Sequence, residues 1–149
     1  MDITQTQVFK KWQHALTRSG YRLTQPRRVI LEIIAGSSRP LSPIEIFDQA
    51  REITAHIGLV TVYRTVEKLE ELKLIDRVHH IGQCQTVFKG SQGHQHLLVC
   101  TECGKSAYFK GLQAEDQFAA VGETYGYEIT GHTLQLSGLC PDCRKKEKL

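Results

Sequence analysis

Two Cys-x-x-Cys pairs constrain the fold of this chain more than any other feature of its sequence. Cys100 and Cys103 form the first pair, Cys140 and Cys143 form the second, and 36 residues separate the pairs. Two residues between cysteines let both thiolates reach one ion from a tight turn, and four thiolates complete the closed tetrahedral shell of a structural zinc. We therefore predict a four-Cys zinc site that clips a whole sub-domain whose own core is small.

Two other interpretations of these pairs are disulfides and a redox-active centre. The chain has five cysteines, an odd number, and its N-terminus shows no basic stretch followed by an apolar one. We therefore expect a cytoplasmic protein without a disulfide framework. Thioredoxin-like chemistry needs a single pair, whereas this chain has two. Because no apolar run approaches the roughly 20 residues of a membrane helix, we expect no membrane association.

Basic charge is concentrated at the start of the chain. Residues 1–31 carry six basic side chains and one acidic side chain, a net charge of +5, whereas the whole chain of 149 residues carries +3. A basic N-terminal segment in a chain that is otherwise near neutral indicates a polyanionic partner. The alternative is that these basic side chains only form the solvated face of a helix. Five of the seven histidines lie from residue 79 onward, so metal ligands gather in the other half of the chain.

The first half has the element order of a winged helix-turn-helix domain. Apolar residues recur at helical spacing in four segments, with Thr24 as an expected N-cap and a capping box from Ser42 to Glu45. Alternating residues then predict a hairpin with a turn at 81–82. The expected helices span about residues 8–19, 24–36, 42–53 and 60–72, and the expected strands span 74–78 and 86–88. We assign residues 1–90 to this domain.

The second half has a different pattern after a linker at 91–93. We expect strands at 97–99, 106–109, 127–129 and 132–136, and a helix at 113–125 that Gly126 ends. These elements form a small α/β domain over residues 91–149. The predicted fold class is therefore α+β, an N-terminal winged helix-turn-helix domain followed by a small domain clipped by the four-Cys zinc site.

Four segments carry a family likeness: Gly-Tyr-Arg-Leu-Thr-Gln-Pro-Arg at 20–27, Gly-Leu-Val-Thr-Val-Tyr-Arg-Thr at 58–65, His-Gln-His at 94–96 before Cys-Thr-Glu-Cys-Gly, and Cys-Pro-Asp-Cys at 140–143. In this order and spacing they resemble the ferric uptake regulator (Fur) family of bacterial metal-sensing repressors. The resemblance implies a winged-helix DNA-binding domain, a metal-binding dimerisation domain, and a homodimer on a palindromic double-stranded operator. It further implies a metal-responsive repressor of metal uptake and homeostasis genes.

The first turn of the fourth helix is the expected DNA-reading surface. Thr61, Tyr63 and Arg64 lie around it, and a recognition helix enters the major groove with its N-terminal residues leading. Arg64 would contact guanine or phosphate, and Tyr63 a thymine methyl or phosphate. Arg22 is similar to the family's minor-groove contact. The alternatives are an ion pair of Arg64 with Glu67 and a core position for Tyr63.

A second metal site is implied inside the dimerisation domain. His94, His96, Glu115 and His132 match the spacing of a family metal site when they are counted from the cysteines. Nitrogen ligands with one carboxylate suit Zn²⁺, Fe²⁺, Mn²⁺ or Co²⁺ and do not select among them. The alternative is that each histidine is an ordinary polar residue.

The family's inter-domain regulatory site is not reproduced. Several positions where relatives carry ligands differ here: Arg39-Pro40, Lys89, Gln95, Leu97 and Tyr108. A substitute sensing site would use Asp76, which matches a ligand of zinc-sensing relatives, with His79, His80 and Cys84 beside it. Thiolate and imidazole favour zinc over iron(II). The alternatives are exposed wing histidines with a buried Cys84, or His94 or His96 joining Asp76.

The leading interpretation is a repressor whose metal shifts the population toward one DNA-binding geometry. Its rivals are a constitutive DNA-binding regulator with structural metals only and a peroxide-responsive member of the same family. A zinc hydrolase would need an open metal site and a general base, and no His-Glu-x-x-His segment occurs. We therefore expect no enzymatic activity and no small organic substrate.

Overall fold

The chain divides into two units, Met1–Ser91 and Gln92–Leu149. The computed structural model describes residues 3–78, 86–90, 95–111 and 114–146, so the predicted turn at 81–82 and linker at 91–93 lie outside the described residues. Among the described helices, none combines the length and the apolar character that crossing a bilayer requires.

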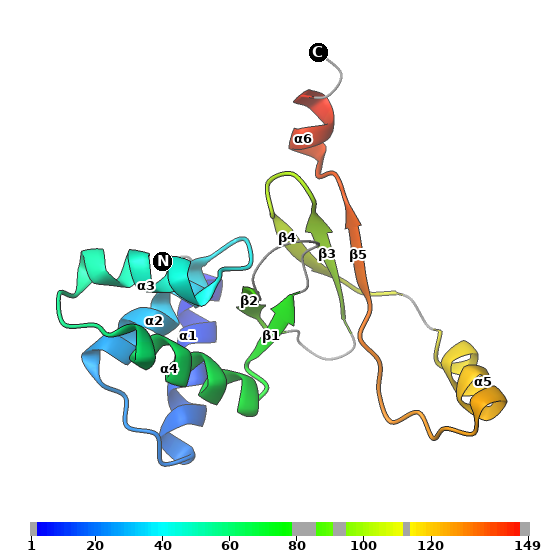
Figure 1. The fold of residues 1–149 in the computed structure, drawn as a ribbon, viewed down its shortest axis with the longest axis horizontal. Helices are drawn as coiled ribbons and strands as arrows, with labels where there is room; N and C mark the ends of the chain where they lie inside the picture. The colour runs from blue at the N-terminus through cyan, green and yellow to red at the C-terminus, as the bar shows by residue number, and fades with distance from the viewer. Residues whose placement is uncertain (1–2, 79–85, 91–94, 112–113, 147–149) are drawn as a thin grey trace. The chain divides into compact units, whose positions relative to one another are not determined.

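The described part of the first unit contains four helices and a two-stranded antiparallel sheet (Figure 1). Ile75 pairs with Lys89 and Val78 with Thr86, and Leu41 forms an isolated bridge to Val87. The predicted order of elements is confirmed. The elements are α1 (Ile3–Arg18), α2 (Gln25–Gly36), α3 (Pro43–Ile53), α4 (Leu59–Glu71), β1 (Ile75–Val78) and β2 (Thr86–Lys89).

All four helices contribute to the core of the first unit. Leu16, Ile30, Ile46 and Leu69 are completely buried, and burial of such a side chain stabilises the fold by about 1.5–3 kcal/mol. The helix α1 begins earlier than predicted, at Ile3 rather than residue 8. Its first residues are mostly polar, so the apolar pattern used for prediction does not reach them. The core fixes which face of α4 points outward.

The predicted capping box at the start of α3 is present in full. Ser42 Oγ accepts a hydrogen bond from the Glu45 amide at 3.2 Å, and Glu45 Oε2 accepts one from the Ser42 amide at 2.8 Å. Glu45 Oε1 also accepts a hydrogen bond from the Arg39 guanidinium at 2.7 Å. Burial raises the pKa of Glu45, but the hydrogen bonds from Arg39 and Ser42 outweigh burial and hold this pKa below its usual value.

We expect the stabilisation by ionised Glu45 to depend on pH. Because the folded-state pKa is lowered, the contribution is present above the unfolded pKa and is lost as the pH falls through the folded pKa. Glu45→Gln keeps the capping geometry, so at pH 7 it should lower the free energy of unfolding by less than about 1 kcal/mol. Urea unfolding at pH 7 and at successively lower pH measures the change, and a difference from wild type that did not shrink as the pH falls would contradict this account.

The second unit is built on a three-stranded sheet of order β4-β3-β5 (Figure 1). Strand β3 is antiparallel to β4 and parallel to β5, and this parallel register places Cys100 opposite Gly138. The described elements are β3 (His96–Cys100), β4 (Ser106–Phe109), α5 (Glu115–Tyr125), β5 (Gln135–Gly138) and α6 (Pro141–Lys146). Gly126 ends α5 as predicted, in the left-handed conformation with φ 74°.

The predicted strand at 127–129 is wrong, and the predicted strand at 132–136 begins only at Gln135. The Tyr127 amide turns back to donate to Gly122 O at 2.8 Å, which closes the end of α5. Pairing with β3 starts where the Leu97 amide donates to Leu134 O. A segment with an alternating apolar pattern forms a β-strand only when another strand lies beside it and accepts and donates its backbone hydrogen bonds. In the described part of the chain, no strand lies beside residues 127–133.

Candidate metal centre and nucleic-acid interface

The four cysteines of the two pairs meet at one end of the second unit's sheet. Cys100 ends β3, and the parallel pairing of β3 with β5 brings the segment after β5 to the same end, where Cys140 and Cys143 lie in or before α6. The sulfur atoms of all four cysteines lie within 4.8 Å of one another. Cys103 Sγ and Cys140 Sγ are 3.7 Å apart. With Zn–S bonds of about 2.3 Å, a tetrahedral site has S···S edges of about 3.8 Å, so the cluster has the dimensions of a zinc site.

Backbone amides favour the thiolate form within this cluster. The pKa of Cys100 is lowered to about 6, chiefly by the backbone N–H of Cys103 and next by that of Cys140, whose nitrogen lies 3.3 Å from Cys100 Sγ. The pKa of Cys143 is raised to about 12, chiefly by its hydrogen bond to Cys140. Zinc binds deprotonated sulfur, so an ion held here would displace the protons of these thiols.

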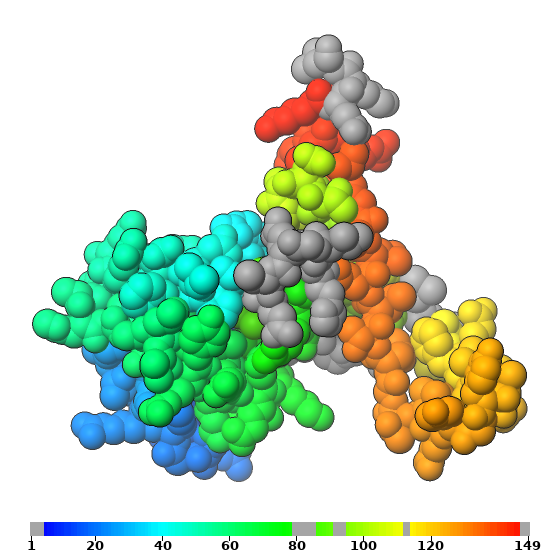
Figure 2. Space-filling view, in the orientation of Figure 1, coloured from blue at the N-terminus to red at the C-terminus, as the bar shows by residue number. Residues whose placement is uncertain are grey.

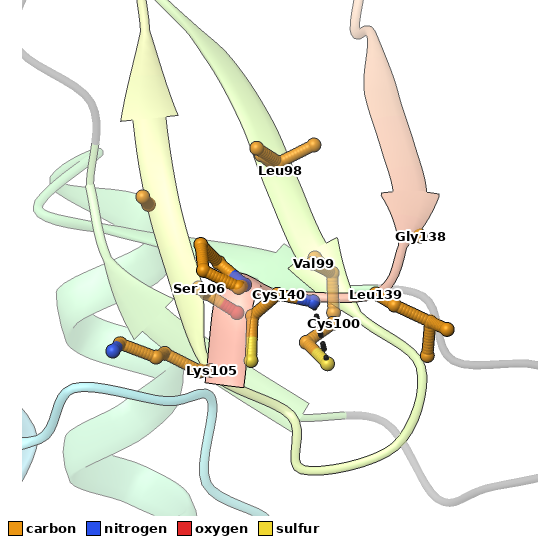
Figure 3. Close-up of a pocket in the computed structure, with 10 residues that line it drawn as sticks. Leu98, Val99, Cys100, Lys105, Ser106, Gly138, Leu139 and Cys140 are labelled. Atoms are coloured by element: carbon orange, nitrogen blue, oxygen red, sulfur yellow. Dashed lines mark hydrogen bonds between the residues drawn. The ribbon is translucent and has the colours of Figure 1, made fainter. Parts of the chain in front are cut away.

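A charged pair connects the two Cys-x-x-Cys turns. Lys105 follows the first turn and Asp142 lies in the second, and Lys105 Nζ is 3.3 Å from Asp142 Oδ2. Figure 3 shows Cys100 and Cys140 side by side, with the Cys140 amide directed at Cys100 Sγ. Beside them is a cavity of about 210 Å³ whose lining includes Leu98, Leu139 and Pro141. The cluster thus lies beside a small apolar space and a bridging ion pair.

The predicted second metal site is only partly assembled. His96 is buried, with 4% of its surface exposed, and its ring centre lies 5.3 Å from that of His132. The His132 ring in turn lies 4.4 Å from that of Phe118 in α5. Glu115 is the exposed first residue of α5, and His94 lies outside the described residues. In the described part of the chain, only the four cysteines form a group of three or more ligands close enough to share an ion.

The speculative sensing site falls largely on residues that the structure does not describe. Asp76 lies on β1 opposite Phe88. Its predicted partners His79, His80 and Cys84 lie outside the described residues. The site therefore remains a prediction.

The first two turns of α4 hold the predicted DNA-reading residues, and Tyr63 and Arg64 are exposed there. Val62 and Leu69 bury the opposite face of the helix, while Arg64 is exposed and Tyr63 is 44% exposed. Figure 2 shows α4, in green, on the surface of the first unit. Thr61 is half-buried, and its carbonyl accepts a hydrogen bond from the Thr65 hydroxyl at 2.7 Å. Tyr63 is therefore not a core aromatic.

The alternative ion pair of Arg64 is also not formed. Among the described residues, Arg64 has no ion pair with Glu67; the ion pairs of α4 join Lys68 to Glu71 and Glu70 to Arg77. Arg22 is exposed in the segment between α1 and α2. Both arginines therefore present their side chains at the surface of the first unit.

Comparisons with known proteins agree with this arrangement. The ferric uptake regulator family model matches residues 18–137. The chain belongs to the ferric uptake regulator family. The ferric uptake regulation protein of Legionella pneumophila is 33% identical over 131 residues, which cover 87% of this chain and 96% of that protein. The predicted family is therefore confirmed, and its function, a metal-responsive DNA-binding transcriptional repressor, is that of this Fur-family chain.

Solved structures share the fold of this Fur-family chain. The Vibrio cholerae ferric uptake regulator is 29% identical, with a TM-score of 0.64 over 86% of this chain and 98% of that chain. A zinc uptake regulator complexed with zinc and DNA has a TM-score of 0.77 over 99% of this chain and 100% of that chain. It is 18% identical, so this likeness concerns the fold alone. The predicted α+β fold class is confirmed.

Sequence reasoning missed two features of the site. The ion pair between Lys105 and Asp142 joins residues 37 positions apart, and only the register of β3 with β5 brings them together. The guanidinium of Arg27 donates a hydrogen bond to the Arg22 carbonyl at 2.6 Å, a contact that depends on the rotamer of Arg27 and has no signal in residue spacing.

Proposed function

We propose that this Fur-family chain is a homodimeric repressor that reads a palindromic operator through α4 and through Arg22. The observation that carries the proposal is the N-terminal half of α4, where Tyr63 and Arg64 are exposed on a helix whose other face is fixed in the core. In a helix-turn-helix protein the N-terminal residues of the recognition helix contact base edges. A guanidinium is suited to guanine, and an aromatic ring to the thymine methyl. The first unit is thus the proposed DNA-binding domain.

The proposed dimer interface lies in the second unit. Large apolar side chains are exposed there, and monomeric soluble proteins seldom expose many of them together. They include Val121, Tyr125, Tyr127, Ile129 and Leu136, of which the two tyrosines are each 73% exposed. A second copy of the chain that covered them would bury apolar area and place two copies of α4 on one operator. We assign dimerisation to the second unit for this reason.

The four-Cys cluster is the proposed structural zinc site. Cys100, Cys103, Cys140 and Cys143 would hold the ion, which supplies a crosslink between the end of β3 and α6 and leaves no position open for chemistry. The donor set fits zinc because it is all sulfur and has tetrahedral dimensions. Because the site is closed, its ion would be structural and not catalytic. We propose a cytoplasmic location and no enzymatic activity for the chain.

A second, regulatory divalent ion is proposed at His94, His96, Glu115 and His132, and the neighbouring rings of His96 and His132 support a site there. For the sensed ion we propose zinc over iron. Arg39 supports this preference, because it stands where many relatives carry a histidine ligand of the inter-domain regulatory site, and its guanidinium contacts Glu45 and the Pro40 carbonyl instead. Asp76 with His79, His80 and Cys84 remains the proposed sensing site.

Footprinting tests the proposed function most simply. The zinc-loaded protein would be offered a random DNA library, and the selected sites would be footprinted with hydroxyl radicals. We expect an inverted repeat with protection on two half-sites related by a two-fold axis, since the symmetry of the operator mirrors that of a dimer. Selection of direct repeats, or of no consensus at all, would contradict the proposal.

A further inference from the structure

We propose that Arg27 is a positioning residue that prepares Arg22 for DNA by fixing the main chain of the α1–α2 loop, residues 19–24. Arg27 Nη1 donates a hydrogen bond of 2.6 Å to the carbonyl oxygen of Arg22. The same guanidinium lies 4.1 Å from the centre of the Tyr21 ring. One side chain of the first turn of α2 thus holds two successive residues of the loop. The inference rests on the proposed function, in which Arg22 contacts DNA.

The α1 side of the loop is fixed independently. Gly20 has φ 76°, a left-handed conformation that favours glycine. Its amide donates to Thr17 O at 3.0 Å, and the Tyr21 amide donates to Leu16 O at 3.0 Å. These two bonds form the Schellman motif that ends many helices. The loop is therefore held at its start by α1 and at Arg22 by Arg27.

This arrangement requires the shape of arginine as well as its charge. A planar guanidinium can donate a hydrogen bond in its plane while its face lies on an aromatic ring, whereas a lysine ammonium is a point charge on a flexible stem. Holding the loop before binding lowers the entropy that is lost when Arg22 enters a groove. Arg22 itself is exposed. We infer that Arg27 acts on DNA affinity through the conformation of Arg22.

The test compares charge-conserving and charge-removing variants on operators with different flanks. Full-length, zinc-loaded wild type, Arg22→Ala, Arg27→Lys and the double variant would be titrated by fluorescence anisotropy against operators flanked by A·T or by G·C pairs. The minor groove distinguishes these two classes of base pair. We expect Arg22→Ala to reduce the preference for A·T flanks at least about fivefold. Arg27→Lys should reduce it by a similar factor with an unchanged salt slope, because its charge is kept.

The double variant and the partner Tyr21 separate positioning from a direct contact. If Arg27 acts through Arg22, the double variant loses no more preference than Arg22→Ala. Tyr21→Phe is the matched control. The Tyr21 hydroxyl is buried and has no hydrogen-bond partner among the described residues, and phenylalanine keeps the ring. We expect Tyr21→Phe to behave as wild type and Tyr21→Leu to lose flank preference.

Three results obtained with the variants would overturn the inference. In the first, Arg27→Lys keeps the wild-type flank preference. In the second, the losses of flank preference from Arg22→Ala and Arg27→Lys add, which would mean that Arg27 acts on the flanks independently of Arg22. In the third, Arg22→Ala leaves the preference unchanged while specific binding persists. If the wild-type protein binds its operator no more tightly than random DNA, the proposed function is overturned together with the inference. This outcome is distinguished from the other three because it appears with the wild-type protein, before any variant is tested.

Discussion

Replacing Cys143 with serine should unfold the second unit and abolish operator binding. Three remaining thiolates leave the tetrahedral shell incomplete, and structural zinc in small domains contributes about 10–16 kcal/mol of apparent binding free energy at pH 7 that is also folding free energy. Cys143 is half-buried in the short helix α6, so serine itself disturbs little packing. We expect zinc content to fall from one structural ion per chain toward zero, and the dimer to dissociate in analytical ultracentrifugation.

Cys84→Ser provides the matched control for this result. It is the same chemical change at the one cysteine that lies outside both pairs. The account expects Cys84→Ser to retain the structural zinc, the dimer and the fold. A Cys143→Ser protein that stayed dimeric and bound its operator as wild type would show that the four-Cys cluster does not hold the second unit together.

Replacing Arg64 with alanine should reduce operator affinity more than any other single change on the DNA-reading face. Loss of a bidentate contact to guanine costs about 1–3 kcal/mol. A homodimer loses the contact in both half-sites, about 2–6 kcal/mol in total, which is a loss in affinity of at least about thirtyfold. Arg64 is exposed and has no ion pair with Glu67 among the described residues, so the fold should not change.

Lys10→Ala removes the same charge from an exposed position of α1 and serves as the control. This variant should lower the affinity for operator DNA and for random DNA by the same small factor, because it removes only a non-specific attraction to phosphate. Arg64→Ala should instead lower the ratio of operator to random-DNA affinity. Anisotropy titrations on both DNAs measure the two ratios, and equal effects of the two variants would assign Arg64 to phosphate binding alone.

Local signals in the sequence predicted the first unit well. The Ser42 and Glu45 capping box forms with both of its hydrogen bonds, because a cap depends on residues three positions apart. The helices and strands of the first unit also follow the apolar pattern, because that pattern depends on residues that are close in sequence. The start of α1 was missed, since the residues before Val8 are mostly polar in sequence and carry no helical apolar repeat.

Features that depend on distant residues were predicted less well. The two Cys-x-x-Cys pairs predicted a shared site because ligand chemistry links them across 36 residues. The strand at 127–129 failed, because an alternating pattern does not say whether a neighbouring strand exists. The hydrogen bond from Arg27 to the Arg22 carbonyl depends on the rotamer of Arg27. The ion pair of Lys105 with Asp142 depends on the register of β3 with β5. Neither is visible in residue spacing alone.

Metal dependence of operator binding tests the central claim most directly. The four-Cys zinc would stay in place while free Zn²⁺ and Fe²⁺ are buffered separately, and anisotropy would follow the affinity of wild type and of His132→Ala for the selected operator. The account predicts that one ion, with zinc favoured, tightens binding of the wild type at least about tenfold, which is about 1.4 kcal/mol of coupling, and that His132→Ala loses this response. Equal affinity with and without either ion would contradict it, and the chain would then be a constitutive DNA-binding protein with structural metal only.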